Sequence, residues 1–357
     1  MSHEIDALFR ELTEASGLPG FEREVRDVIR KYCEQYGSIE YDGLGSIICK
    51  KQGTAQSPRI MLAGHMDEVG FIVAYITEKG FIKFQGVGGW FDQVLLAQRV
   101  VVKTARGDVP GIIGAKAPHL MSEEDRKKVV QMKDMFIDVG ASSREEAEGL
   151  GIRPGDPILP VSGFGVMGNG KVLMAKAWDD RVGCALFIEV LRRLSGVNHP
   201  NTVYAVGTVQ EEVGLRGATT ASHIVNPDVG FALEVDVSGG TPGLEEHEAP
   251  TRLGKGPALT VYDASMVPSA KLRDFVISVA KETGVPLQFS YMARGGTDAG
   301  KMHIHGAGVP SLVIGVPSRY IHSHVGLIHR DDFESAAALM TSVIERLDAA
   351  TAAEFKR

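Results

Sequence analysis

The stretch KVLMAKAWDDRVGCALFIEVLRRLSGVNHPNTVYAVGTV, residues 171–209, decides the fold class of this chain. It opens with an apolar, strand-like run, residues 179–194 have the length and apolar content of a helix, and residues 202–209 form a second apolar run. Strands and helices continue to alternate in this way up to residue 347. This order predicts an α/β fold, a mixed sheet that carries helices on both faces.

The chain before this stretch adds similar elements and then changes in character. Residues 21–37 place apolar side chains three and four apart, which predicts an amphipathic helix, and two strand-like runs follow it. From residue 70 to residue 165, short β-like runs are separated by glycine and proline. We therefore predict one α/β unit, built from residues 1–69 and 166–357, and a small β-rich insert at 70–165 that interrupts it.

Two segments carry the spacing of a helix cap. Ser122 and Asp125 stand at the start of residues 122–134, which predicts a short, solvated helix inside the insert. Asp331 and Glu334 have the same spacing at the start of the last amphipathic segment and predict the beginning of a closing helix there.

The composition narrows the class of protein. Hydrophobic residues make up 44% and charged residues 23% of the 357 residues, which excludes wholesale disorder. Lys and Arg number 38 against 45 Asp and Glu, a net charge of −7 that leaves no basic surplus for nucleic acid. There is no apolar run of about 18 residues and no signal-peptide pattern near the start, so we expect a cytoplasmic protein without a membrane partner. Cys33, Cys49 and Cys184 are scattered and form no CxxC pair, which argues against a disulfide framework and against a thiolate zinc site.

Five apolar runs end on side chains that can bind metal ions or transfer protons. Ligands of open α/β sheets bind beyond the carboxyl ends of the strands, so polar groups at these positions are expected to lie together. The pairs are His65 with Asp67, Asp179 with Asp180, Glu211 with Glu212, Glu234 with Asp236, and His322 with His324. A helix cap or a surface histidine explains one such pair, but five strand ends of this kind indicate a shared site.

The donor types indicate two divalent ions. Two histidines and several carboxylates, without cysteine, suit zinc, cobalt or manganese. Asp179, Glu212 and Glu234 offer more carboxylates than a single catalytic zinc uses, and one bridging carboxylate would give each of two ions about three protein ligands. Glu211 adjoins a ligand while its side chain points to the other face, which makes it the candidate general base.

Several segments resemble the signatures of the M42 family of metallo-aminopeptidases, which includes tetrahedral (TET), glutamyl and deblocking aminopeptidases. The segments are GHMDEVG (64–70), AWDDRVGC (177–184), VQEEVGLRGA (209–218), ALEVD (232–236), RGGTDAG (294–300) and YIHSHVG (320–326). LPGFEREVR (18–26) and APHLMSEE (117–124) extend the resemblance over nearly the whole chain. The resemblance implies a dinuclear metal-dependent enzyme that removes N-terminal residues from peptides.

Transferred residue by residue, the resemblance implies the metal ligands His65, Asp179, Glu212, Glu234 and His322, with Asp179 bridging the two ions. It also implies that Glu211 is the general base, that Asp67 orients His65 and that the Asp179–Asp180 peptide bond is cis. Family members commonly have Asp in place of Glu234, and Asp236 points to the same face of its strand, so Asp236 is the alternative fifth ligand. We interpret His324 as a substrate contact rather than a ligand.

The insert resembles the small β-barrel-like domain of the family, which implies a role in dimerisation. The family often assembles such dimers into a hollow tetrahedral dodecamer. The resemblance therefore implies a homo-oligomer that takes unfolded peptides as substrates.

Other interpretations stay open at the level of the sequence. A dinuclear metallo-carboxypeptidase or N-deacylase would share the metal ligands but needs a cation for the substrate carboxylate, and Arg294 and Arg319 lie near the signature segments. A glycosidase would use paired carboxylates as acid and base, which leaves His65 and His322 without a role. A metal-stabilised scaffold protein would have a closed coordination shell without a bound water.

Overall fold

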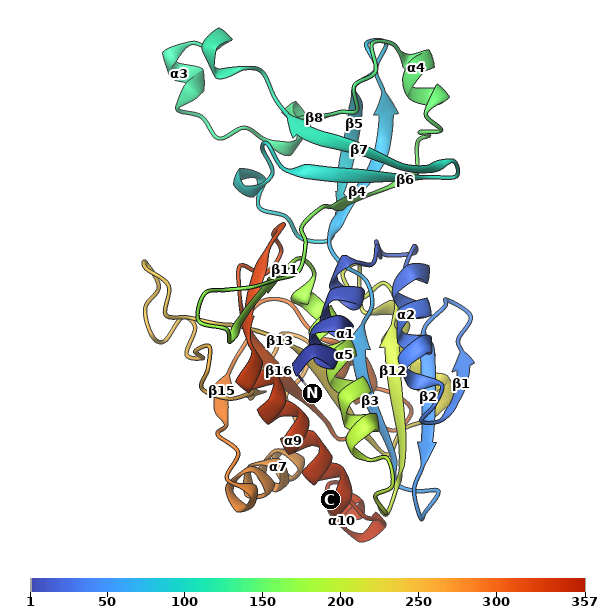
Figure 1. Ribbon diagram of the computed structural model, residues 1–357. Coiled ribbons are helices and arrows are strands. Elements are labelled where there is room, and N and C mark those ends of the chain that lie inside the picture. Colours follow the sequence, from blue (N-terminus) through green and yellow to red (C-terminus); the bar gives the residue numbers. More distant parts are fainter. Residues whose placement is uncertain (1, 357) are drawn as a thin grey trace.

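The computed structural model describes residues 2–356 and consists of two units (Figure 1). Both ends of the chain lie in the larger unit, and the smaller unit stands on one end of it. Among the helices of residues 2–356, none combines the length and the apolar character needed to cross a membrane.

The larger unit is built on a mixed sheet, as predicted. Its strands follow in the spatial order β1 (Ser38–Tyr41), β2 (Ile47–Gln52), β12 (Thr202–Thr208), β3 (Arg59–His65), β13 (Val229–Val237), β16 (Ser311–Arg319), β17 (Gly326–His329), β11 (Val172–Ala175) and β10 (Gly165–Val166). Two short strands, β14 (Ala258–Thr260) and β15 (Gln288–Ser290), pair beside β16. The four strands β12, β3, β13 and β16 are parallel, whereas β2 and β17 on either side of them are antiparallel to their neighbours.

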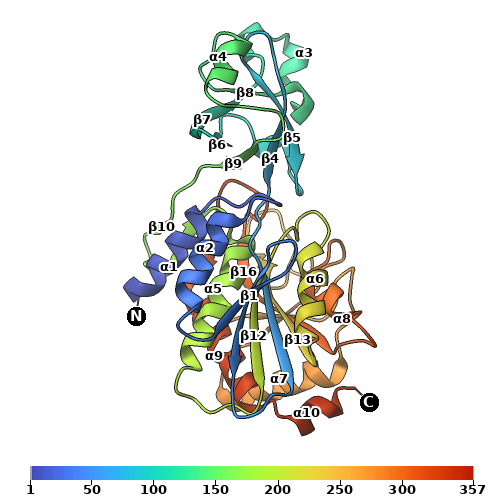
Figure 2. The ribbon, with the colours of Figure 1, turned by 90° about the vertical axis from the view of Figure 1, so that its right-hand side faces the viewer.

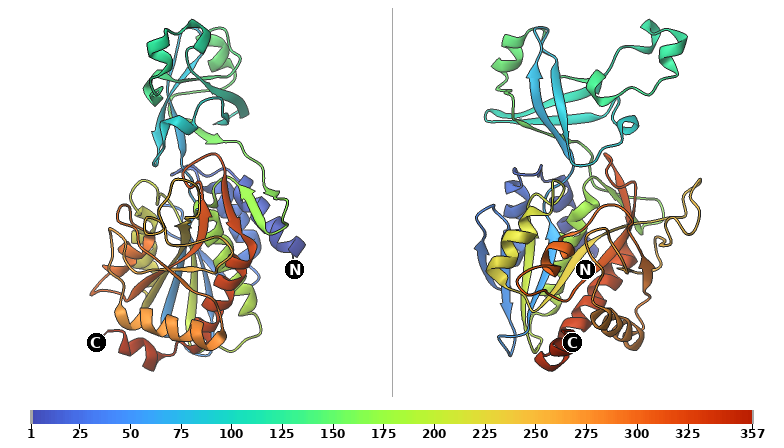
Figure 3. Two further views of the ribbon diagram at one scale, coloured as in Figure 1. Left: turned by 90° about the vertical axis from the view of Figure 1, so that its left-hand side faces the viewer. Right: turned by 180° about the vertical axis from the view of Figure 1, so that it is seen from behind.

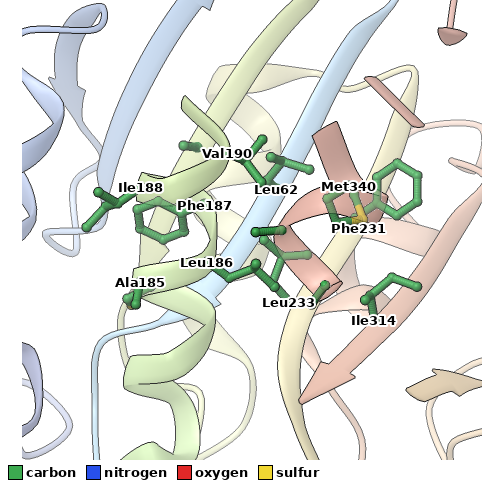
Figure 4. Packing of buried hydrophobic residues seen from close by; sticks show 14 of the residues in the cluster. Leu62, Ala185, Leu186, Phe187, Ile188, Val190, Phe231, Leu233, Ile314 and Met340 are labelled. Carbon is green, nitrogen blue, oxygen red and sulfur yellow. The ribbon is translucent and has the colours of Figure 1, made fainter. Parts of the chain in front are cut away.

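Helices cover both faces of this sheet (Figure 2), which confirms the predicted arrangement. One face carries α1 (Ser2–Glu14), α2 (Arg23–Cys33), α5 (Trp178–Arg193), α7 (Ala270–Thr283) and α9 (Arg330–Arg346). The other face carries α6 (Arg216–Val225) and α8 (Asp298–His303), and the short α10 (Ala349–Glu354) follows α9. The main core lies between α5 and the sheet, where Leu186 packs among Leu62, Leu233 and Ile314 (Figure 4).

Helix α5 is enclosed on all sides, and its sequence reflects this. Residues 180–191 are all buried and, apart from Asp180, Arg181 and Glu189, are apolar or glycine, as expected of a helix that is buried all round. Gly183 allows the close approach to the sheet, because a Cβ atom there would lie 2.0 Å from the carbonyl oxygen of Leu233. This packing fixes the start of α5, including Asp179, against the ends of the central strands.

The smaller unit is a closed β-barrel (Figure 3). Its strands follow in the order β4 (Gly70–Ile76), β5 (Ile82–Val87), β8 (Phe136–Asp138), β7 (Gly107–Gly114), β6 (Arg99–Thr104) and β9 (Pro157–Pro160), and β9 pairs with β4. The loops carry α3 (Glu123–Arg126), α4 (Arg144–Gly149) and the 3₁₀ turns η1 (Asp92–Val94), η2 (Pro118–Leu120) and η3 (Met132–Asp134). Phe71, Ile82, Val100 and Ile137 belong to a hydrophobic core of its own. These strands all lie within the segment 70–165 that the sequence marks as an insert.

Two predicted helix starts differ in detail. The solvated helix expected at 122–134 is only the single turn α3, although Ser122 caps it by accepting the Asp125 N–H, because an exposed segment of this length has no packing partner to extend it. The closing helix α9 begins after His329, whose ring nitrogen accepts the Asp331 N–H at 3.2 Å, so Asp331 is not its cap.

Candidate metal centre

The parallel strands bring the predicted side chains to one edge of the sheet. Because these strands run in the same direction, their carboxyl ends lie at the same edge. His65 ends β3, Glu211 and Glu212 follow β12, Glu234 lies in β13, His322 follows β16, and Asp179 begins α5. The chain enters the barrel at Gly70, so this edge of the sheet faces the barrel.

His65, Asp179 and Glu234 form a first cluster of donor atoms, with one atom from each residue within 4.8 Å of the others. The His65 Nε2 atom lies 2.9 Å from Asp179 Oδ1 and 4.0 Å from Glu234 Oε2. The carboxylate of Glu211 comes within 3.8 Å of the same nitrogen. Glu211 therefore lies beside this cluster without belonging to it, as expected of a general base next to the metal ligands.

Asp179, Glu212 and His322 form a second cluster with the same 4.8 Å limit. The His322 Nε2 atom lies 3.3 Å from Asp179 Oδ2 and 3.4 Å from Glu212 Oε1. Asp179 thus belongs to both clusters, with Oδ1 next to His65 and Oδ2 next to His322. A carboxylate with one oxygen in each of two donor clusters has the arrangement of a bridging ligand.

The chemistry of the two clusters fits a pair of divalent cations. The Oε1 atoms of Glu212 and Glu234 are buried and make no hydrogen bond to the residues that the structure describes. Burial raises the pKa of the Glu212 carboxyl and raises the pKa of Glu234 well above its ordinary value, because an uncompensated buried carboxylate is unfavourable. Cations of the zinc, cobalt or manganese kind, which take imidazole and carboxylate donors, would compensate these charges.

Asp67 connects two of the strand ends. Its backbone carbonyl oxygen lies 2.9 Å from His65 Nδ1, whereas its carboxylate is 3.8 Å from that nitrogen. The carboxylate instead accepts the backbone N–H groups of Glu211 and Glu212, each at 3.0 Å. The contact that orients the His65 ring is therefore made by the carbonyl of Asp67, and the carboxylate of Asp67 holds the Glu211–Glu212 segment.

Asp180 supports the same edge. Its carboxylate accepts the backbone N–H of His65 at 3.0 Å and that of Gly183 at 3.0 Å. The peptide bond between Asp179 and Asp180 is cis, which confirms the expectation from the family resemblance.

Two further predicted side chains lie apart from the clusters. Asp236 Oδ2 accepts the hydroxyl of Thr251 at 2.5 Å, and Asp236 belongs to neither donor cluster, whereas Glu234 does. His324 is 4% exposed and packs with its ring centroid 5.5 Å from that of Trp90. His324 is not among the residues that line the cavity described next.

A cavity of about 660 Å³ opens onto both clusters. Besides the predicted ligands and Glu211, its lining includes Leu215, Val237, Glu248, Tyr291, Met292 and Arg294. The lining therefore combines several carboxylates with side chains of mixed polarity, and the cavity has room for a side chain of a substrate. Arg294 belongs to this lining and Arg319 does not.

A buried ion network beside the site was not expected from the sequence. Lys176 Nζ lies 2.5 and 2.7 Å from the two carboxylate oxygens of Glu68, and Arg181 Nη2 lies 3.1 Å from Glu68 Oε1. Arg181 also donates to the carbonyl oxygens of Leu12 and Ala15 at the end of α1. Charged residues within the apolar segments that carry His65 and Asp179 are the signal that could have revealed this network.

The comparisons with known proteins agree with this site. The family profile described as M42 glutamyl aminopeptidase matches residues 45–339. The crystal structure of a TET aminopeptidase from a marine-sediment thaumarchaeon is 51% identical, with a TM-score of 0.97 over 99% of both chains. The glutamyl aminopeptidase of Lactococcus lactis is 37% identical over 349 residues, which is 97% of each chain. The TET1 peptidase of Pyrococcus horikoshii, which can assemble into a tetrahedron or a large octahedral shell, is 32% identical, with a TM-score of 0.86 over 96% of this chain and 100% of that one.

These matches extend over both the α/β unit and the barrel, and the segments that carry the donor clusters lie inside the matched range. Identities of this size over nearly the whole length of both chains go beyond a shared fold. The chain belongs to the M42 family of metal-dependent aminopeptidases.

Proposed function

We propose that this chain removes N-terminal residues from peptides with the help of two divalent metal ions. The proposed ligands are His65, Asp179, Glu212, Glu234 and His322, with Asp179 serving both ions. The observation that carries this proposal is the position of the two Asp179 oxygens, 2.9 Å from His65 Nε2 and 3.3 Å from His322 Nε2. Two independent single-metal sites would not need a shared carboxylate.

Zinc, cobalt or manganese bound there would polarise the substrate carbonyl and lower the pKa of a water molecule. Glu211 lines the cavity next to His65, so its carboxylate can accept a proton from the attacking water and return it to the leaving amine. The carboxylates that line the cavity attract the free α-ammonium group of a substrate. An internal peptide bond has no such cation, which accounts for exopeptidase action.

Metal removal and substrate choice test this function together. After stripping with a chelator, the protein should lose its activity on aminoacyl anilides and regain it with zinc, cobalt or manganese. N-acyl amino acids tested in parallel examine the carboxypeptidase or N-deacylase alternative, in which Arg294 would bind the substrate carboxylate. Turnover of N-acyl substrates without turnover of aminoacyl substrates would contradict the aminopeptidase proposal.

Replacement of Glu211 tests its role as the base. Glu211→Gln should reduce turnover by about 10² to 10⁴-fold, the usual contribution of a general base, while elemental analysis still finds both ions. Glu248→Gln is the matched control, because Glu248 also lines the cavity but belongs to neither donor cluster. Near-normal turnover of Glu211→Gln would assign the base elsewhere.

We further propose that the insert, residues 70–165, is a dimerisation domain and that dimers build a tetrahedral dodecamer. Support comes from the separate core of the barrel and from its exposed apolar residues Leu120 and Val129, which are 73% and 48% exposed. A closed shell would admit unfolded peptides and exclude folded proteins. Sedimentation velocity should give the mass of a dodecamer, and a stable monomer would contradict this part of the proposal.

The proposed compartment is the cytoplasm. Cys33, Cys49 and Cys184 are all buried free thiols, which suits reducing conditions. Cell fractionation followed by immunodetection tests this, and recovery of the protein outside the cytoplasmic fraction would contradict it.

A further inference from the structure

A loop of the barrel reaches the second donor cluster. Gly89, which follows strand β5, lines the cavity together with the proposed ligands. A Cβ atom at Gly89 would lie 3.0 Å from His322 Nδ1, and one at Gly88 would lie 3.3 Å from Glu212 Oε2. The backbone of this barrel loop is therefore in close contact with two proposed ligands that come from the α/β unit.

The two glycines are required for different reasons. Gly88 has φ +78°, a conformation that other residues rarely adopt, and a Cβ there would lie 2.6 Å from Val69 Cγ1. The φ angle of Gly89 is outside this left-handed region, so the backbone itself would accept a side chain. At Gly89 a Cβ atom would lie 3.0 Å from Nδ1 and 3.4 Å from Cε1 of His322, so the imidazole would have to move by a few tenths of an ångström.

Trp90 fixes the glycine pair in place. Its ring stacks on Phe71 with the ring centroids 4.8 Å apart, and its Nε1 donates to the carbonyl oxygen of Gly70 at 2.9 Å. Both partners lie at the start of β4, where the chain leaves the edge of the sheet. The Trp90 ring also packs against His324, two residues after His322, at 5.5 Å between ring centroids. Trp90 thus ties the loop to the segment that carries His322.

His322 lies in a segment that depends on its surroundings for its shape. It has φ +57° and Tyr320 has φ +63°, and such left-handed conformations cost about 1 kcal/mol or more for residues other than glycine. The His322 side chain is partly buried, with 38% of its surface exposed. Its Nε2 faces Asp179 and Glu212, and its Nδ1 side faces Gly89. The ring is held between the carboxylates and the barrel loop.

We infer that Gly88, Gly89 and Trp90 are positioning residues of the metal centre, through which the barrel holds His322 and Glu212 in place. This inference rests on the proposed two-metal function. It assigns the loop to one ion position only, because the other cluster adds His65 and Glu234, and neither lies among the atoms nearest to the glycine pair. Disturbing the loop should therefore weaken the binding of one ion and spare the other.

Titration of the chelator-stripped protein with zinc tests this selectivity. In Gly89→Ala the new methyl group must displace the His322 ring. Calorimetry should therefore show a dissociation constant at least tenfold larger for one of the two zinc ions and an unchanged constant for the other. Gly149→Ala is the matched control in the same barrel, since no atom lies within 4 Å of a Cβ there. Wild-type binding of both ions by Gly89→Ala, or equal weakening of both, would overturn the inference.

Trp90 variants provide a second test that does not depend on the glycine. Trp90→Phe keeps an aromatic ring on Phe71 but loses the hydrogen bond to Gly70, whereas Trp90→Ala loses both. The same zinc position should weaken in the order wild type, Trp90→Phe, Trp90→Ala, while circular dichroism shows a folded protein. Failure of the wild-type chain to bind two ions would contradict the proposed function itself. Two ions bound by wild type with no change in either Trp90 variant would contradict only the role of the loop.

Discussion

Asp67 shows how one side chain can serve two segments of the site. Its carbonyl contacts His65 Nδ1, and its carboxylate holds the backbone of Glu211 and Glu212. In Asp67→Asn the backbone carbonyl remains, but one of the two carboxylate oxygens is replaced by an NH₂ donor that faces the N–H of Glu211 or Glu212. Turnover should therefore fall at least tenfold while the zinc content stays at the wild-type value, as measured by steady-state kinetics and elemental analysis. Loss of zinc with unchanged turnover per bound ion would show that Asp67 acts through His65 instead.

The residues of the site could be predicted from the sequence because one topological rule decides where they lie. Side chains that end parallel strands must share an edge, so His65, Glu212 and His322 come together although they are far apart in the chain. The contacts of individual atoms could not be predicted. Asp236 has the same strand face as Glu234, yet it turns to the hydroxyl of Thr251, a partner that comes from a loop without a recognisable pattern. The ligand roles themselves remain predictions.

Among the elements, helix α5 is largely apolar but carries a buried carboxyl group, that of Glu189, near its C-terminal end. Burial opposes ionisation of Glu189, but hydrogen bonds from Arg192 and Arg193, at 2.6 to 2.8 Å, outweigh it and lower the pKa of this carboxyl. A lowered pKa in the folded state contributes stability above the ordinary carboxyl pKa of about 4.3, and this contribution is lost as the pH falls through the folded value.

Glu189→Gln should therefore destabilise the protein by about 2 kcal/mol at pH 7 and by progressively less as the pH falls from the ordinary carboxyl pKa through the lowered folded value. Urea unfolding of the variant and of wild type over this pH range measures the difference. Glu148→Gln serves as a control, because Glu148 is an exposed residue in the barrel helix α4. A difference that stays constant with pH would mean that the charge of Glu189 does not contribute.

Helix α1 was harder to predict than the central strands. The strands β3 and β13 coincide with apolar runs in the sequence. Helix α1 was not predicted, although Ile5, Leu8 and Leu12 follow a helical spacing. Its residues alternate charge with apolar side chains, and it gains its stability from packing on α5 and from Arg181 at its end. Such tertiary support is not visible in a local pattern.

At the scale of the whole molecule, metal loading should stabilise the fold. Glu211, Glu212 and Glu234 are buried close together, and the pKa of each is raised by burial, so these side chains oppose folding as long as they lack counter-charges. Zinc at about 100 times its dissociation constant should add about 2.7 kcal/mol per ion, visible as a higher unfolding temperature in differential scanning calorimetry. Equal unfolding temperatures with zinc and with chelator would contradict the proposed buried ligands, and Glu234→Gln should show a smaller rise than wild type.

The overall architecture could be predicted because the two units have different patterns. Long apolar runs that alternate with helices mark the α/β unit, and short runs between glycines and prolines mark residues 70–165. The barrel-like form of the insert was implied only by the family resemblance. The contact of its loop with His322 could not be predicted, because it depends on where one unit stands on the other.

The barrel is anchored to the metal centre at one end only. The chain enters it at Gly70, and the Gly88–Trp90 loop contacts the site, whereas α3 and α4 lie at the end away from the larger unit (Figure 1). Substitutions at that distant end are not constrained by the chemistry of the metal centre. If that end carries the proposed subunit contacts, those contacts can change in evolution while the chemistry of the metal centre is inherited unchanged.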